Sequence, residues 1–345
     1  MQRGSRGSRS RARIALRARA PVLAAALALA VLAASADAHA QDMQQLMGRE
    51  LGKLMPRAEY RFTEYPSEPV KGQPTGLENI ENGASFNVPI QQDQTDEWAV
   101  SGDVRYEKNN TSAILPDSGR PLPNTLWDIM VGGSYRHRFE NGWIGALSLG
   151  FGSASDRPFA GPDELVGRVV AFGLLPRGEN DAWIFSLIYA SDQDLFDVNI
   201  PFPGIAYLYH PSKRFNAVIG VPVSAVEYKP VEKLTLEAQY FPLRHVRSRI
   251  TYEMFRPLRF FGGFDWDNER YYPVDRDKAK DQLFYYEKRL MGGVRFDLRH
   301  IGFQVRGGYA FDRFFFVGDS FSDRDQDRID VGSGPFVNGG VMVRF

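Results

Sequence analysis

The sequence predicts an all-β fold, namely a single antiparallel up-and-down β-barrel that spans a membrane with an even number of strands. Three observations predict it. Runs of about ten residues alternate between apolar and polar positions with the period of two that marks a strand. The apolar faces of several runs end in Trp or Tyr, while the opposite faces carry charges at mid-strand. Short and long connections alternate along the chain, as the turns and outer loops of membrane barrels do.

The first element is a secretory signal peptide over residues 1–40. Seven arginines and no acidic residue occupy the first 19 positions, an apolar run follows from Pro21 to Ala34, and Ala38-His39-Ala40 forms a small-residue cleavage site. This three-part layout predicts cleavage near Ala40. An N-terminal membrane anchor is the alternative, but the apolar run is short for a span, which needs about 20 residues.

The second element is residues 41–57. They could form a short amphipathic helix, but we expect a periplasmic lead-in that precedes a barrel over residues 58–345. Beyond residue 40 the chain holds 35 basic and 41 acidic residues, which argues against a nucleic-acid partner. The chain has no cysteine, so disulfides, thiolate metal sites and thiol catalysis are excluded.

The strands follow in order. In the run 97–107, Trp98 and Tyr106 share an apolar face, whereas Asp103 and Arg105 share the opposite one. The strand prediction is weakest over 214–229, because the two strands expected there are short. Fusing or dropping strands in that region and near residue 60 would lower the total number of strands. We therefore favour 14 to 16 strands, with 12 also possible. The full set of sixteen is expected near 58–65, 84–91, 97–107, 126–139, 142–152, 165–175, 181–190, 202–210, 214–221, 223–229, 232–241, 243–255, 258–266, 282–298, 301–316 and 334–345.

Alternation alone also fits a soluble β-sandwich. A buried sandwich core could not hold many unpaired charges, whereas a wide aqueous lumen can. If the arginines line open water they would favour anions, and if they pair with acidic residues across strands they would close the lumen. The charges expected to face the lumen are Asp103, Arg105, Arg136, Glu237, Arg247, Arg249, Arg295, Asp297, Arg306 and Arg344.

The chain ends in a strand rather than in a polar tail, with Val341, Val343 and Phe345 on one face. Together with the signal peptide and the alternating strands, this ending resembles a bacterial outer-membrane β-barrel protein, and the chain is similar to uncharacterised barrels of that class over residues 58–345. The resemblance implies that these three residues are an assembly signal, and that the last strand closes against the first so that no edge remains. It also implies three partners: outer-membrane lipid, the barrel-assembly machinery and periplasmic chaperones.

No catalytic, cofactor or metal site is predicted. The histidines beyond residue 40 are His137, His210, His245 and His300, and none has H-x-H or H-E-x-x-H spacing. The acidic string over 323–330 opens like a calcium loop, but it lacks the glycine at position six and the glutamate at position twelve. A salt-bridged outer loop is therefore the favoured interpretation of this string.

These observations favour a passive pore for small hydrophilic solutes and not an enzyme. A non-conducting barrel with a surface-binding or envelope-structural role is the alternative. A lipid hydrolase is less favoured, because no serine motif accompanies the histidines.

Overall fold

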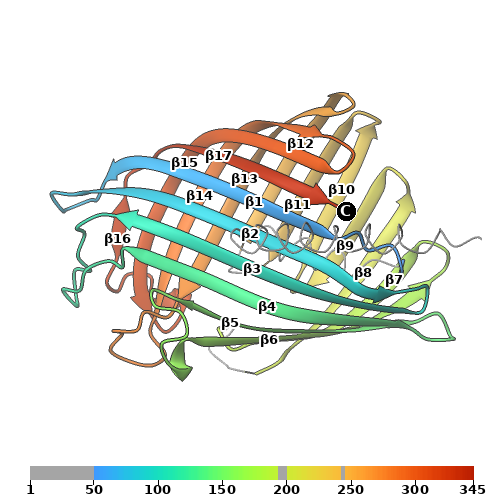
Figure 1. Ribbon diagram of the computed structural model, residues 1–345, viewed down its shortest axis with the longest axis horizontal. Coiled ribbons are helices and arrows are strands. Elements are labelled where there is room, and N and C mark those ends of the chain that lie inside the picture. The colour runs from blue at the N-terminus through green and yellow to red at the C-terminus, as the bar shows by residue number, and fades with distance from the viewer. Residues whose placement is uncertain (1–49, 193–199, 242–244) are drawn as a thin grey trace, which may run out of the picture.

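The computed structural model describes residues 50–192, 200–241 and 245–345, which form one antiparallel β-barrel (Figure 1). The signal peptide predicted over 1–40 and the first part of the lead-in, residues 41–49, lie outside the described residues. The sheet is closed because the last strand pairs with the first, from Arg57 opposite Arg344 to Glu64 opposite Val337. Closure satisfies the backbone groups of both terminal strands, so neither strand is left as an edge.

Sixteen strands form the barrel wall, and each of the sixteen predicted ranges corresponds to one of them. A seventeenth, β16 (Ile329–Val331), pairs with β15 beyond the outer end of β17. The wall strands are β1 (Arg57–Pro69), β2 (Gly76–Gln92), β3 (Asp96–Asn110), β4 (Thr125–Arg138), β5 (Ile144–Ser155), β6 (Leu165–Arg177), β7 (Asp181–Ala190), β8 (Phe202–Ser212), β9 (Phe215–Val221), β10 (Ser224–Val231), β11 (Leu234–Phe241), β12 (His245–Phe255), β13 (Leu258–Tyr271), β14 (Gln282–Asp297), β15 (Ile301–Gly318) and β17 (Gly334–Arg344). Two 3-10 turns, η1 (Pro162–Glu164) and η2 (Phe321–Asp323), lie in the loops.

The alternative expectation of 12 or 14 strands in the barrel is wrong, because the wall has sixteen. The region 214–229 forms two separate strands, β9 and β10, which pair with each other and with β8 and β11. The region near residue 60 likewise forms a full strand, β1, that pairs with both β2 and β17. Each of the two short strands, β9 and β10, therefore has a neighbour on both sides, and neither presents an unpaired edge.

The outer face of the wall is apolar. Val131, Leu149, Ile250 and Val305 are among the exposed large apolar side chains. Aromatic pairs lie between neighbouring strands on this face, such as Trp98 stacked on Tyr135 with ring centroids 4.2 Å apart. An apolar band with aromatic rings on a closed barrel is the architecture of a bacterial outer-membrane β-barrel, and it excludes the soluble sandwich.

Among the described residues, neither of the helical segments is long and apolar enough to cross a membrane.

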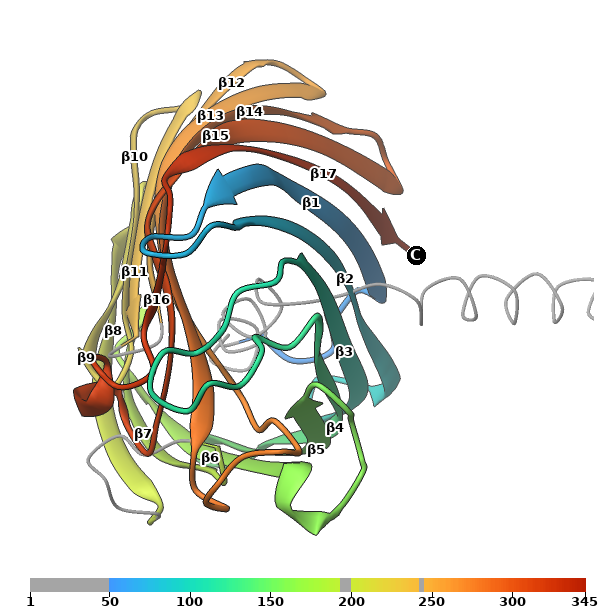
Figure 2. The same cartoon turned by 90° about the vertical axis from the view of Figure 1, so that its left-hand side faces the viewer.

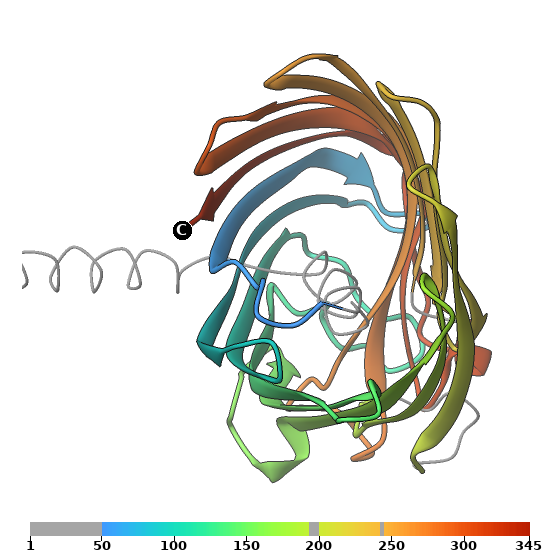
Figure 3. The ribbon, with the colours of Figure 1, turned by 90° about the vertical axis from the view of Figure 1, so that its right-hand side faces the viewer.

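The two ends of the barrel differ. Connections of two to five residues join the strands at one end, whereas the other end carries longer loops, including 111–124, 272–281 and 319–333. Short turns face the periplasm in outer-membrane barrels, so these ends are called the periplasmic end and the outer end below. Figure 2 looks onto the outer end, where loops lie across the opening. Figure 3 looks onto the periplasmic end, where the segment before β1 lies inside the opening.

Candidate functional site

The outer half of the lumen is filled by apolar side chains. Sixteen buried residues from eight strands and from the loops form one cluster there, and it includes Leu115, Leu126, Tyr271, Tyr285 and Phe315. These residues come from β4, β13, β14, β15 and the β3–β4 loop, so the cluster joins distant parts of the wall through the lumen. The barrel is therefore closed to solvent over its outer half, as far as the described residues extend.

The segment that follows β13 crosses the lumen. The backbone N–H of Tyr272 donates to the carbonyl oxygen of Ala154 at 2.7 Å. Ala154 belongs to β5, and β5 and β13 lie on opposite sides of the sixteen-strand wall. We call residues 272–281, which follow β13, the crossing segment. A direct backbone hydrogen bond between opposite walls means that no open passage separates them at this level.

Polar contacts hold the crossing segment against the β5–β6 loop. The guanidinium of Arg276 donates to Glu164 at 2.9 Å, and these two side chains are only 5% and 6% exposed. Arg276 also donates to the carbonyl oxygen of Asp163 at 3.0 Å. Nearby, the N–H of Val274 donates to the Asp156 carboxylate at 2.8 Å. Charge-assisted hydrogen bonds of this kind are stronger than neutral ones. Separating the buried pair costs free energy, because each charge would be left in a poorly hydrated site without its partner.

A second contact joins two other outer loops. The N–H groups of Asp117 and Ser118 both donate to the Asp327 carboxylate, at 2.7 and 2.8 Å. The N–H of Asp327 in turn donates to the Asp117 carboxylate at 2.6 Å. In the same loop Arg328 forms an ion pair with Asp330 at 2.9 Å. The carboxylates of the acidic string thus have protein partners, and no group of three or more possible metal ligands occurs within the described residues.

The closure should respond to pH through Asp281, which ends the crossing segment and is 8% exposed. Burial raises the pKa of this carboxyl above its ordinary value, and a hydrogen bond with the Asp319 carboxyl adds to the rise. Since the closed form binds the proton more tightly, its stability is greatest in acid and falls as pH rises through the raised pKa. We expect the contacts of the crossing segment to weaken as pH rises above the ordinary carboxyl pKa of about 4, which a spin label at the exposed position 277 would report as greater mobility. The same dependence in Asp319→Asn, whose amide can donate to Asp281, would contradict this assignment.

At mid-height the lumen holds a network of charges. Arg105 on β3 contacts Glu269 on β13, and this ion pair spans the lumen because the two strands are not neighbours. The Asp265 carboxylate is 2% exposed and lies 3.3 Å from Arg247 and 3.8 Å from Arg306. It also lies 3.8 Å from Arg289. One buried carboxylate therefore serves three guanidinium groups.

The remaining residues expected in the lumen fall into smaller groups. Arg136 pairs with Glu97 at 2.9 Å, with both side chains 4% exposed. Asp297 accepts from Arg295 at 2.9 Å and lies 3.5 Å from Arg344. The other three are placed as follows: Asp103 is buried, Arg249 lies over the Phe261 ring at 4.9 Å, and Glu237 is opposite Arg249 in the β11–β12 register.

Sequence reasoning missed several charged residues of the network, namely Arg61, Glu81, Asp265, Glu269, Glu287 and Arg289. Glu81 and Glu269 lie on outer parts of β2 and β13 that the predicted strand ranges left out. Arg289 has the same parity on β14 as Arg295, so extending the period-two pattern toward the outer end would have found it.

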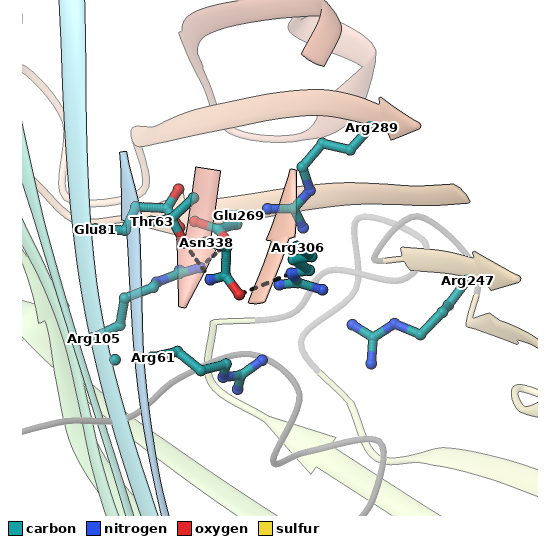
Figure 4. A pocket seen from close by; sticks show the side chains of 10 residues that line it. Arg61, Thr63, Glu81, Arg105, Arg247, Glu269, Arg289, Arg306 and Asn338 are labelled. Atoms are coloured by element: carbon teal, nitrogen blue, oxygen red, sulfur yellow. Dashed lines mark hydrogen bonds and ion pairs between the residues drawn. The ribbon is translucent and has the colours of Figure 1, made fainter. Parts of the chain in front are cut away.

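Two small cavities lie within this network. One, of about 30 Å³, is lined by Arg61, Arg105, Arg247, Arg289 and Arg306 together with Thr63, Glu81, Gly83, Glu269 and Asn338 (Figure 4). The other, also about 30 Å³, shares Arg61 and lies closer to the periplasmic end, with Glu59, Arg249 and Arg295 among its lining residues. Each has room for only a few water molecules.

The periplasmic end is partly covered by residues 50–56, which we call the strap. Leu51 is 5% exposed and packs into an apolar cluster with Ile144, Leu174, Ile184 and Val218. The strap contains neither helix nor strand. Its contacts place the end of the lead-in against the barrel itself, inside the periplasmic opening (Figure 3).

Hydrogen bonds to β2 and β3 fix the strap. The N–H of Gly52 donates to the Glu97 carboxylate at 3.1 Å. The backbone of Leu54 both donates to and accepts from the side-chain amide of Gln92, each at 3.0 Å. Gly52 has a φ of +75°, and a Cβ there would lie 2.6 Å from the carbonyl oxygen of Asp93, so only glycine fits.

Leu51→Ala is expected to release the strap. Removing a buried leucine side chain costs about 2–5 kcal/mol, which corresponds to a rise of tenfold or more in the detached population. Lys53 lies within the strap, so the rate of trypsin cleavage after Lys53 in the folded barrel measures this population. Met55→Ala is the matched control, because Met55 is 55% exposed. Equal cleavage rates in the two variants would contradict the packing role of Leu51.

Comparison with known proteins finds no matching family model and no matching curated protein. Among solved structures, Pseudomonas aeruginosa OccK7 (OpdD) has a TM-score of 0.35 at 11% identity, covering 84% of this chain and 98% of that one. Pseudomonas putida OprB has a TM-score of 0.32 at 11% identity, covering 91% and 99%. The β domain of the Bordetella autotransporter BrkA has a TM-score of 0.31 at 11% identity, covering 84% and 99%. Likenesses of this size carry no inference about the function of this chain.

Proposed function

We propose that this chain is a gated outer-membrane channel for small hydrophilic solutes, and that the conformation described above is its closed state. In the same proposal residues 1–40 are a signal peptide that is removed near Ala40. The N-terminal sequence of the protein purified from membranes tests that cleavage.

The observation that carries the proposal is the way the outer end is closed. Among the described residues, the crossing segment joins opposite walls through one backbone hydrogen bond, Tyr272 to Ala154, and otherwise through side-chain contacts, namely the apolar packing of Tyr272 and polar pairs such as Arg276 with Glu164. These contacts can break while the wall stays intact, because no wall strand pairs through them. A gate needs an element of this kind, with two arrangements of similar free energy.

The size and lining of the barrel support the same proposal. Barrels of about eight strands are filled by side chains, whereas those of 16 or more can leave an aqueous channel. Toward the periplasmic end the charged side chains of Glu59, Arg295 and Arg344 are 18%, 24% and 32% exposed. Partly exposed charges on the inner face of a wide barrel suit contact with water and with hydrophilic solutes.

Single-channel recording in planar bilayers tests the proposal. Protein purified from membranes should show long silent periods interrupted by rare steps, and the reversal potential in a salt gradient should report the preferred ion. Continuous open steps from the wild-type protein would contradict a gated closure. Silence under all conditions, including in variants that break the closure, would remove the channel proposal.

A second candidate is a non-conducting barrel with a surface-binding or envelope-structural role. The sixteen-residue apolar cluster that fills the outer half favours it, since burying that cluster stabilises the closed form. This candidate takes the lead if closure-breaking variants fold and remain silent.

The assembly signal belongs to the same proposal. Phe345→Ala is expected to lower the outer-membrane yield several-fold, because Phe345 ends the chain at the strand that assembly factors would bind. Phe345 is 62% exposed, so its loss should cost little stability. Phe303→Ala, another exposed aromatic residue of the outer face, is the matched control and should assemble normally. A normal yield for Phe345→Ala would contradict the assignment.

A further inference from the structure

We propose that the strap is a hinged lid over the periplasmic opening of the lumen, and that it detaches from the barrel as one unit. As a second gate, in series with the crossing segment, it controls access from the periplasm. That role rests on the proposed function, whereas the existence of the lid does not.

The first argument is the path of the strap. The chain joins the wall at β1, but the apolar cluster that holds Leu51 is built from β5 to β9. Between these points the N–H of Gly52 is bonded to Glu97 on β3. Figure 3 shows the strap inside the opening rather than along its rim. Detaching it therefore widens the periplasmic opening.

The second argument is the kind of contact that holds the strap. Among the described residues, the backbone of 50–55 bonds to no backbone group of the wall, and its partners there are the side chains of Glu97 and Gln92. Leu51 is the one residue of the strap that is buried. All of these contacts can be lost while every strand pair of the wall stays intact, as a moving element requires.

The third argument is a defined hinge. The carbonyl oxygen of Pro56 accepts from the N–H of Phe345 at 3.0 Å, so the chain is fixed to the wall from Pro56 onward. On the other side, Leu54 is the last residue bonded to Gln92. Met55 lies between these two fixed points and is 55% exposed. A residue in this position can absorb the change in backbone angles when the strap moves.

The balance of free energies suits two states. One buried leucine and a few hydrogen bonds favour the attached form. The conformational entropy that the strap regains favours the detached form. These opposing contributions are of similar size for a segment this short, so a small change at one contact shifts the population of the whole strap.

Amide hydrogen exchange of the protein purified from membranes tests the lid. Gln92→Ala removes both bonds to Leu54, and the amide of Gly52, which bonds to Glu97 instead, should then exchange about tenfold faster. Gln91→Ala is the matched control, because Gln91 is also exposed on β2 and its loss should leave the rate at Gly52 unchanged. An unchanged rate at Gly52 in Gln92→Ala would overturn the lid, since each contact would then open alone.

Gly52→Ala provides the reciprocal measurement. The φ of +75° and the approach of Asp93 prevent alanine from adopting the attached conformation, so the amide of Leu54 should exchange about tenfold faster or more. The amide of Phe345, which bonds to Pro56 beyond the hinge, should keep its rate. Acceleration at Phe345 by the same factor would place the moving boundary inside the wall and overturn the hinge.

The gating role is tested separately in Arg276→Ala, which breaks the buried pair that anchors the crossing segment. Adding Gln92→Ala should make the largest conductance level more frequent than adding Gln91→Ala does. Equal frequencies, with faster exchange at Gly52, would overturn the gating role and retain the lid. Silence of Arg276→Ala itself would overturn the proposed channel and the gating role with it, while the exchange rates would still decide the lid.

Discussion

Replacing Arg276 by alanine is expected to turn a mostly silent barrel into one with long-lived conductance steps. The Arg276–Glu164 pair is almost completely buried and anchors the crossing segment to the β5–β6 loop. Removing one partner of a buried pair costs about 3–5 kcal/mol, because the other charge is left without compensation. That free energy acts on the closed form alone, so the open population should rise by a factor of about 100 or more.

The control for this experiment is Arg324→Ala. It removes the same charge at the same end of the barrel, but Arg324 is exposed on the β15–β17 loop. Its recordings should match those of the wild-type protein. Equal open probabilities in Arg276→Ala and Arg324→Ala, with both proteins folded, would show that the buried pair does not hold the closure.

The second large effect is expected for Asp265→Ala, this time on stability. Asp265 is the shared partner of Arg247, Arg289 and Arg306 and is almost fully buried. Its loss leaves adjacent guanidinium groups with less compensation, and we expect the free energy of unfolding to fall by about 3–5 kcal/mol. Urea unfolding in detergent or lipid measures this free energy. The folded fraction is detected by the heat-modifiable gel mobility of the barrel.

Asp325→Ala provides the comparison, since the Asp325 side chain is 89% exposed in an outer loop. Surface substitutions of this type change stability by about 0.5 kcal/mol or less. An equally small change for Asp265→Ala would mean that the arginines of the network are stabilised by other groups.

The period-two pattern predicted the wall because lipid and lumen impose opposite demands on alternate residues. Even β9 and β10, which have only 7 and 8 residues, lie within a residue or two of their predicted ranges. The pattern fails toward the outer end, where the lumen itself is apolar. Residues 282–286 of β14 are buried on both faces, and the same holds for 314–316 of β15. Runs without alternation there reflect the filled lumen, a signal that alternation counting discards.

Contacts across the lumen could not be predicted from local pattern. Arg105 and Glu269 meet because β3 and β13 face each other across the barrel, and no spacing in the sequence encodes that pairing. The sequence therefore left open whether the lumen charges face water or pair with one another. In the structure most of the predicted lumen charges form ion pairs. The contacts that close the outer end lie in loops, and a period-two pattern does not predict which loop residues meet.

Conductance of a cross-linked variant tests the central claim, that the crossing segment closes the outer end. The chain has no cysteine, so Arg157→Cys with Asp275→Cys gives one defined pair of thiols. The two native side chains form an ion pair at 2.7 Å between the β5–β6 loop and the crossing segment. A short bismaleimide should link them and abolish the rare openings, whereas the unlinked protein should open more often than wild type. Unchanged conductance steps after complete cross-linking would contradict the claim.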